Sequence, residues 1–155
     1  MSEPNFLNIV VAIDGSEPSF DAADYAISFA DLYKSQLTAL YVVPARVHRD
    51  FDSDMPDEKM PDQIKKIMTE AKIESEPWFK RIKIVIGDES LVNFRTKIIL
   101  SSVKVPEVIV NFSEDAKVDL IVIGTRGRSG FKRLLLGSVA SDTAMYAHCP
   151  VLVVK

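Results

Sequence analysis

The sequence predicts an α/β protein in which an open, parallel, five-stranded sheet is covered by helices on both faces. Short apolar runs, rich in valine and isoleucine, alternate along the chain with longer segments of helical periodicity. Such continuous apolar runs are typical of strands that are buried on both faces, as parallel strands under helices are. Of the 155 residues, 47% are hydrophobic and 26% are charged, which is the composition of a single folded domain and excludes a disordered chain.

The N-terminal part begins this alternation. Strands are expected at residues 6–13 and 36–43, each a nearly continuous apolar run. Between them, Ser16 is expected to cap a helix that reaches about Lys34, with Pro18 tolerated in its first turn.

The middle of the chain differs in composition. Residues 45–62 carry six carboxylates and two prolines, so we expect a solvated, mobile loop that is dispensable for the fold. An apolar stripe then predicts a long helix over residues 62–86, weakened or kinked by Pro77 and ended by Gly87. The run 82–86 also has strand propensity, but the stripe continues through it and favours the helix.

The remaining elements continue the alternation. Strands are expected at residues 96–100, 119–123 and 151–154, and helices at residues 105–117 and 138–148. This order implies right-handed crossovers and a parallel sheet. Ligands of such sheets bind beyond the carboxyl ends of the strands, where the strand order reverses.

Composition also limits the classes of partner and compartment. The net charge of −3 argues against a general nucleic-acid binder. No apolar stretch approaches the length of a spanning helix, and residues 6–13 are too short for a signal peptide core. The single cysteine, Cys149, cannot form an internal disulfide. We therefore expect a soluble cytoplasmic protein that binds neither nucleic acid nor membrane.

A glycine-containing loop at residues 124–138 follows a predicted strand and leads into a predicted helix. It carries four cations and no acid, and subtracting these four charges from the net −3 leaves −7 for the rest of the chain. Glycines let backbone amides approach a ligand, and a helix N-terminus adds donors and a positive dipole end, so the loop favours an anion such as phosphate. The alternative is a tight connection whose glycines only turn the chain. Neither the P-loop nor the dinucleotide fingerprint occurs.

The spacing Gly124-x2-Gly127-x9-Gly137-Ser138 resembles the glycine signature of the nucleotide-binding branch of the universal stress protein family. The flanking sequences DLIVIGTRGRSG and GSVASDTAMYAHCPVLVVK, and the N-terminal VAIDGS, also resemble that family. The resemblance covers nearly the whole chain and is weak through residues 45–95.

This resemblance implies a flavodoxin-like, Rossmann-like fold that binds ATP, with magnesium held mainly through the phosphates, and that often dimerises. It places Ala12 and Asp14 by the base and ribose, Val42 on adenine, Ile123 and Gly124 near base and sugar, and Arg126, Gly127, Gly137, Ser138, Val139 and Ala140 around the phosphates. Many family members carry Ser or Thr at the position of Ala140, so one phosphate hydrogen bond is missing here. A homodimer is expected through residues 151–154, an apolar sheet edge that would otherwise be bare.

Two of these residues have a structural reading beside the functional one. Asp14 suits either ribose hydroxyls or a turn at the start of a helix, and Ser138 suits either phosphate or a helix N-cap. The adenine contact of Val42 depends on the resemblance alone. Gly127→Val is expected to impair nucleotide binding, because a β-branched side chain resists positive φ and blocks the approach of phosphate.

We expect no metal site formed by the protein itself. The run Asp50-x-Asp52-x-Asp54 begins like a calcium loop, but Met55 and Pro61 stand where such a loop needs glycine and glutamate. The two histidines and the cysteine lack zinc-ligand spacing.

The leading functional hypothesis is a regulatory, stress-response protein that holds ATP and turns over little or none of it. Residues 124–138 contain no Asp, Glu, His, Gln or Asn that could position or activate water, so no catalytic residue is assigned. The alternatives are a slow ATPase or adenylate-transferring enzyme on the same scaffold, and a dimeric interaction module that binds no nucleotide.

Overall fold

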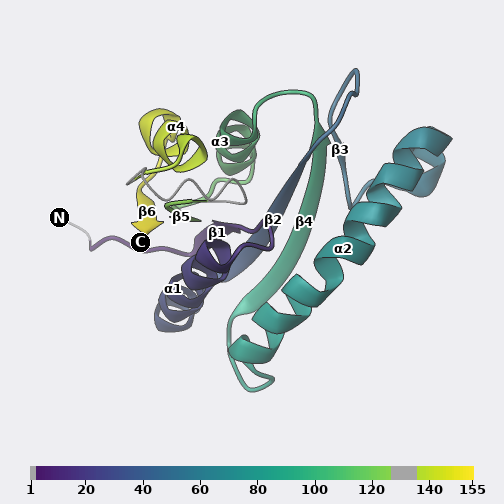
Figure 1. Cartoon of the computed structure of the whole chain (residues 1–155). Coiled ribbons are helices and arrows are strands. Elements are labelled where there is room, and N and C mark those ends of the chain that lie inside the picture. Colours follow the sequence, from purple (N-terminus) through teal and green to yellow (C-terminus); the bar gives the residue numbers. More distant parts are fainter. Residues whose placement is uncertain (1–2, 127–135) are drawn as a thin grey trace.

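The computed structural model describes residues 3–126 and 136–155 and contains a mostly parallel sheet of six strands with helices on both faces (Figure 1). The strands are β1 (Asn8–Ala12), β2 (Gln36–Pro44), β3 (Phe51–Asp52), β4 (Asn93–Ser101), β5 (Leu120–Gly124) and β6 (Val151–Val154). The helices are α1 (Glu17–Tyr33), α2 (Asp62–Ile86), α3 (Val105–Asp115) and α4 (Ser138–Tyr146), with a 3₁₀ turn, η1, at Asp57–Lys59. The predicted α/β class is confirmed.

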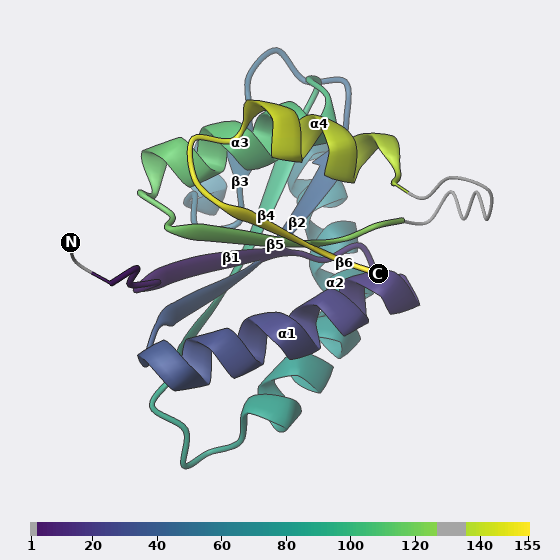
Figure 2. The same ribbon diagram turned by 90° about the vertical axis from the view of Figure 1, so that its left-hand side faces the viewer.

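The helices cover the sheet in two pairs. Helices α1 and α2 lie on one face, and α3 and α4 lie on the other (Figure 2). Alternate residues of the buried strand β1 pack against the two helix layers, because successive side chains of a strand point to opposite faces of the sheet. Ile9 and Val11 pack with α1 residues such as Ala22, whereas Val10 packs with Ile109 of α3.

The sheet has the order β3-β4-β2-β1-β5-β6, and all pairings are parallel except that of β3 with β4. From β1 the chain goes to β2 on one side, and it later returns to β5 on the other side. The carboxyl ends of β1 and β5 therefore flank the point where the strand order reverses, which is where doubly wound folds bind ligands.

The prediction of five strands was wrong by one, and the missing strand lies in the acidic segment 45–62. Strand β3 pairs antiparallel with β4, with Phe51 opposite Leu100. The Phe51 side chain is fully buried, and Met60 is 4% exposed. Both pack with apolar residues of α2 such as Ile64. The segment is therefore not a solvated loop throughout; its mobility stays a prediction.

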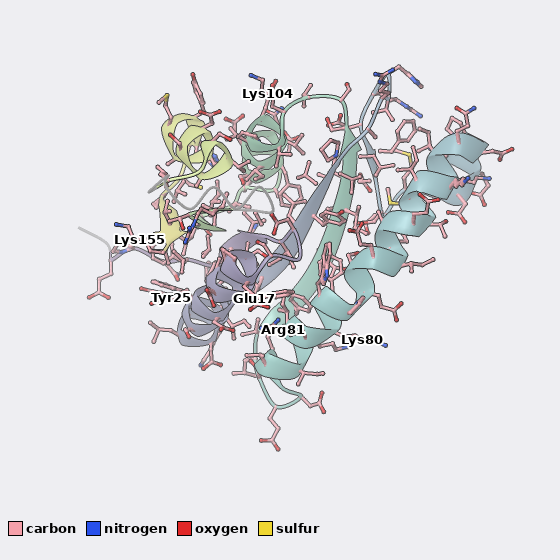
Figure 3. All side chains as sticks on the ribbon, viewed as in Figure 1. Glu17, Tyr25, Lys80, Arg81, Lys104 and Lys155 are labelled. Carbon is pink, nitrogen blue, oxygen red and sulfur yellow. The ribbon has the colours of Figure 1, made fainter. Side chains whose placement is uncertain are left out.

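Helix α2 confirms the choice of helix for residues 82–86. It runs through Pro77 to Ile86, and Gly87 follows with a φ of +81°. The Nη1 atom of its Arg81 lies 3.3 Å from the Oε1 atom of Glu17 in α1, and Figure 3 shows these two side chains between the helices. The Arg81 guanidinium also stacks on the Phe20 ring at 4.0 Å, so a cation–π contact joins α1 to α2.

The other elements agree with the predictions except at their ends. Strand β4 begins at Asn93, ahead of the expected residue 96, and α3 ends at Asp115, short of residue 117. Element ends are the least certain part of any sequence-based assignment. Among the described residues, no helix combines the length and the apolar character needed to cross a membrane.

Candidate functional site

A cavity of about 370 Å³ opens at the carboxyl ends of β1, β2 and β5, against the start of α4. Ten of the eleven predicted site residues line it: Ala12, Asp14, Val42, Ile123, Gly124, Arg126, Gly137, Ser138, Val139 and Ala140. The eleventh, Gly127, lies outside the described residues. Residues that are far apart in the sequence thus meet at the switch point of the sheet.

Asp14 stands where β1 leads into α1. Its Oδ1 accepts hydrogen bonds from the backbone N–H of Ser16, at 2.9 Å, and from the Ser16 hydroxyl. Ser16 is in turn the N-cap of α1 and accepts from the N–H of Ser19. The turn role weighed from the sequence is therefore present. The two oxygens of a carboxylate offer about four lone-pair sites, so the turn role and a ligand role are compatible.

The start of α4 supplies backbone donors to the cavity. Gly137 is the N-cap and has no side chain to offer, so the first-turn amides have no side-chain cap. The Ser141 N–H donates to the Gly137 carbonyl at 2.9 Å, which is the first i→i+4 bond of the helix. The amides of Ser138, Val139 and Ala140 precede it and form the positive end of the helix dipole, and these three residues line the cavity. Ser138 lies inside the helix, so the N-cap role considered for it was wrong.

The glycines of the signature also have structural roles. A Cβ on Gly124 would lie 2.7 Å from the carbonyl oxygen of Pro18, and one on Gly137 would lie 2.8 Å from that of Thr125. The Gly137 N–H donates to the Thr125 carbonyl at 2.6 Å and so joins the two ends of the loop. The structure thus supports the reading in which glycines permit close backbone packing, alongside any contact with a ligand.

One wall of the cavity is apolar. Val42, Ile123 and Ala140 belong to a cluster that also includes Ile109 of α3. Arg126 is the one cation, and Asp14 the one carboxylate, among the described residues that line the cavity. The site thus combines an apolar wall with polar and basic groups at one end. This arrangement suits a flat apolar ring system that carries an anionic group.

Several lining residues were not foreseen. They are Ile13, Ser19, Leu40, Tyr41, Pro44, Val105, Ile109 and Thr125. Pro44 directly follows the predicted strand 36–43, and Thr125 lies two residues beyond the predicted strand 119–123, so their place at a carboxyl edge was a usable signal. Val105 and Ile109 carried no such signal, because only the tertiary packing places α3 over β2 at this end of the sheet.

The remaining chemistry-bearing groups lie elsewhere. Asp52 and Asp54 both contact the Lys97 ammonium, which accounts for two carboxylates of the calcium-like run. No group of three or more potential metal ligands occurs within residues 3–126 and 136–155. Cys149 is half-buried, and its burial together with the nearby Asp119 charge raises the pKa of the thiol. A raised pKa keeps it protonated and unreactive at neutral pH.

Comparison with known proteins shows the family and the fold of this chain. The model of the universal stress protein family matches residues 5–155. The universal stress protein MJ0531 of Methanocaldococcus jannaschii is 38% identical over 150 residues, covering 97% of this chain and 82% of its own.

Two solved structures show the same fold. Universal stress protein UspA from Lactobacillus plantarum superposes with a TM-score of 0.76 at 22% identity, covering 99% of this chain and 100% of its own. The universal stress protein from Archaeoglobus fulgidus in complex with dAMP has a TM-score of 0.64 at 21% identity, covering 97% and 98%. The family match over nearly the whole chain is decisive, and this chain belongs to the universal stress protein family.

Proposed function

We propose that the cavity binds ATP and that the protein acts in the cytoplasm as a regulatory, nucleotide-holding module of the stress response. The convergence of ten predicted residues on one cavity at the switch point is the observation that supports this most strongly. The dAMP complex of the Archaeoglobus fulgidus relative supports an adenine nucleotide as the ligand.

The ligand is proposed to lie with its base against the apolar wall and its phosphates at the start of α4. Val42 and Ile123 would contact adenine, and Asp14 would accept from the ribose hydroxyls. The amides of Ser138 and Val139, the Ser138 hydroxyl and Arg126 would hold the phosphates, because each donates to or attracts an anion. Magnesium would be bound mainly through the phosphates, and Arg126 favours a nucleotide with several of them.

The first test is the nucleotide content of the purified protein. Protein denatured in acid is expected to release ATP at close to one equivalent per chain, identified by anion-exchange chromatography. Protein stripped of nucleotide is expected to rebind ATP more tightly than adenosine in a calorimetric titration, because adenosine lacks the phosphates that face α4. Absence of released nucleotide together with no titratable binding would instead favour the dimeric interaction module.

ATP bound in this way is expected to be hydrolysed slowly, well under about 1 s⁻¹. Hydrolysis needs a group that positions or activates water, as well as positive charge near the phosphates. Asp14 is the one carboxylate among the described lining residues, and it is proposed to contact the ribose. Single-turnover hydrolysis with magnesium measures the rate. Repeated turnover at enzyme-like rates, lost in Asp14→Ala, would favour the enzyme reading.

A homodimer through β6 is proposed as the assembled form. Among the residues that the structure describes, strand β6 pairs with β5 alone and is the last strand of the sheet, and Val151, Leu152 and Val153 are half-buried. The Pro150 and Val154 carbonyls accept hydrogen bonds from the N–H groups of Ile121 and Thr125, on the β5 side. Because this direction alternates along a strand, the N–H and C=O of Val153 point away from β5.

Light scattering at tens of micromolar is expected to show a dimeric mass for the unmodified protein. Val153→Pro is expected to give a monomer, because it removes an outward donor and leaves the bonds to β5 in place. Leu152→Ile, which keeps every backbone donor, is the control. A monomeric mass for the unmodified protein would contradict the proposal.

A further inference from the structure

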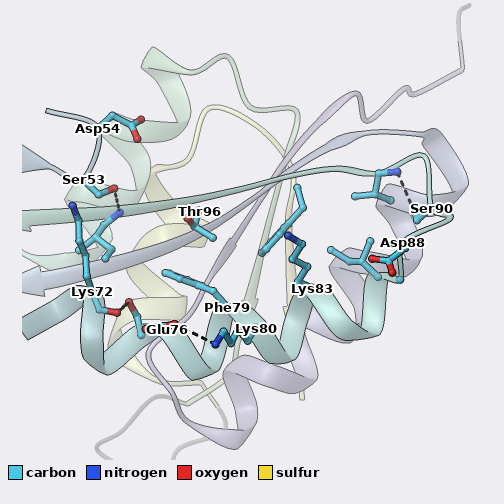
Figure 4. Close-up of a pocket in the computed structure, with 16 residues that line it drawn as sticks. Ser53, Asp54, Lys72, Glu76, Phe79, Lys80, Lys83, Asp88, Ser90 and Thr96 are labelled. Carbon is cyan, nitrogen blue, oxygen red and sulfur yellow. Dashed lines mark hydrogen bonds and ion pairs between the residues drawn. The ribbon is translucent and has the colours of Figure 1, made fainter. Parts of the chain in front are cut away.

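A second hollow of about 770 Å³ lies between α2 and the first half of β4 and shares no lining residue with the cavity described above. Figure 4 shows Phe79 and Lys83 of α2 and Thr96 of β4 directed into the space between the helix and the strand. Apolar side chains on both sides, including Phe79 and Phe94, form its floor. We call this hollow the α2–β4 groove.

One side of the α2–β4 groove is a strand edge that β3 covers only in part. Strand β3 pairs with Ile99 and Leu100 of β4. One residue further along, Ser53 N–H donates to the Ile98 carbonyl at 2.9 Å, and the Ser53 hydroxyl accepts from Ile98 N–H at 2.9 Å. After Ser53 the chain leaves the edge. The rest of the β4 edge has no strand beside it within the described part of the chain.

The backbone groups left on this edge belong to Thr96 and Phe94. Hydrogen-bonding direction alternates along a strand, so these two residues present their N–H and C=O to the same side as Ile98 does. Asn93 N–H donates to the Ser35 carbonyl on the β2 side, which agrees with this alternation. Two residues with four backbone hydrogen-bonding groups therefore continue the line of β3.

The side chains beside this edge are of two kinds. Thr96 and Phe94 line the α2–β4 groove, so they face α2, and Arg95 between them faces the opposite side of the sheet. In an antiparallel pair, residues directly opposite each other share a face. In an added strand, the side chains opposite Thr96 and Phe94 would therefore lie over the apolar floor, where apolar residues fit. The side chain opposite Arg95 would lie on the other face of the sheet, where a polar or charged residue fits.

The charges around the edge favour an acidic partner. Lys72, Lys83 and Arg95 form no ion pair with any described residue, whereas Lys80 is paired with Glu76 at 3.2 Å. Asp88 is the one acid of the groove lining without such a pair. The unpaired charge along the edge is thus mainly positive.

A second copy of this chain fits the edge poorly. Antiparallel pairing of two β4 strands about Thr96 would place Arg95 directly opposite Lys97, and like charges in that position destabilise a sheet. An acidic side chain opposite Arg95 would be attracted instead. The edge therefore favours a different chain over a copy of itself.

We propose that the free edge of β4 binds an extended segment of a partner protein by antiparallel strand addition. The segment carries apolar residues opposite Thr96 and Phe94 and an acidic residue opposite Arg95. Main-chain hydrogen bonds supply the affinity, and the alternation of side chains supplies the specificity. This surface lies apart from the proposed nucleotide site, so it is tested independently of ATP binding.

The probe is a fluorescein-labelled peptide, Ser-Glu-Val-Glu-Val-Glu-Ser, whose binding is measured by fluorescence anisotropy. We expect saturable binding, and protection of the Phe94 and Thr96 amides from hydrogen exchange in the complex. N-methylation of both valine nitrogens, which removes the donors that face β4, is expected to weaken binding at least about tenfold. Replacement of the three glutamates by lysine is expected to weaken it by a similar factor.

Thr96→Pro removes one outward N–H without touching the ladder to β2, and it is expected to lower peptide affinity about tenfold. Thr96→Val keeps the N–H and is the matched control, expected to bind like the unmodified protein. Arg95→Glu is expected to reverse the preference toward the lysine peptide. Thermal unfolding verifies that each variant folds. If Thr96→Pro does not fold, the N-methylated peptide still tests the proposal on the unmodified protein.

Three results of the peptide experiments would overturn the proposal. They are no binding of the glutamate peptide at millimolar concentration, equal binding of the N-methylated peptide, and protection that appears at β6 instead of β4. A concentration-dependent association of the protein that Thr96→Pro abolishes would assign the edge to a second copy of the chain and would also overturn it.

Discussion

Asp14→Ala is expected to weaken ATP binding roughly 10- to 100-fold, because hydrogen bonds to a charged group are each worth about 1.5–3 kcal/mol. The carboxylate lines the cavity beyond the end of β1 and is proposed to accept from the ribose hydroxyls. Isothermal titration with ATP, on protein stripped of nucleotide, measures the change. An affinity equal to that of the unmodified protein would remove Asp14 from the proposed site.

The control for Asp14→Ala must separate its ligand role from its turn role. The backbone N–H and the hydroxyl of Ser16 both donate to the Asp14 Oδ1, and Ser16 caps α1. Ser16→Ala removes the hydroxyl and the cap, at a cost of about 1 kcal/mol in the free energy of unfolding, but it keeps the carboxylate. ATP affinity is expected to survive Ser16→Ala. An equal loss of affinity in both variants would show that Asp14 acts by shaping the turn.

Phe51→Ala is expected to lower the free energy of unfolding by about 3–5 kcal/mol, because it empties a large, fully buried site. Phe51 packs with Met60, Ile64 and Met68 beneath α2. For a domain of this length, that loss corresponds to a fall in Tm of roughly 10 °C. Chemical denaturation gives the free energy, and a scanning calorimeter gives the Tm.

The matched control for Phe51→Ala is Asp57→Ala, an exposed position in the same segment that is expected to change stability little. Limited proteolysis adds a second measurement. Cleavage within residues 45–62 is expected to become faster in Phe51→Ala, because the docked aromatic ring holds the segment to α2. If Phe51→Ala lowers the free energy of unfolding by less than about 1 kcal/mol, the whole segment is the mobile, dispensable loop expected from its composition.

Local patterning was sufficient for most of the fold. Continuous apolar runs revealed the five parallel strands, and the apolar stripe of α2 correctly overruled the strand propensity of residues 82–86. The signature around Gly124 and Gly137, with the flanks of β1, revealed ten residues that line one cavity. These features are readable because each depends on residues that are close in sequence.

Other features depend on contacts between distant segments, and the sequence carries little local trace of them. Phe51 is a single apolar residue among acids, and it is buried only because α2 and β4 are there to receive it. The same holds for Val105 and Ile109, which reach the cavity only because tertiary packing brings α3 over β2.

The sequence by itself determined the class of fold, the place of the cavity at the strand ends and most of its lining. Tertiary structure decided that Gly124 must pass close to Pro18, that the acidic segment adds a sixth strand, and that this strand stops before Thr96. The physical reason is that apolar periodicity reports which face of an element is buried, but not which element covers it. Strand pairing and close backbone approach are set by the partners that packing brings together.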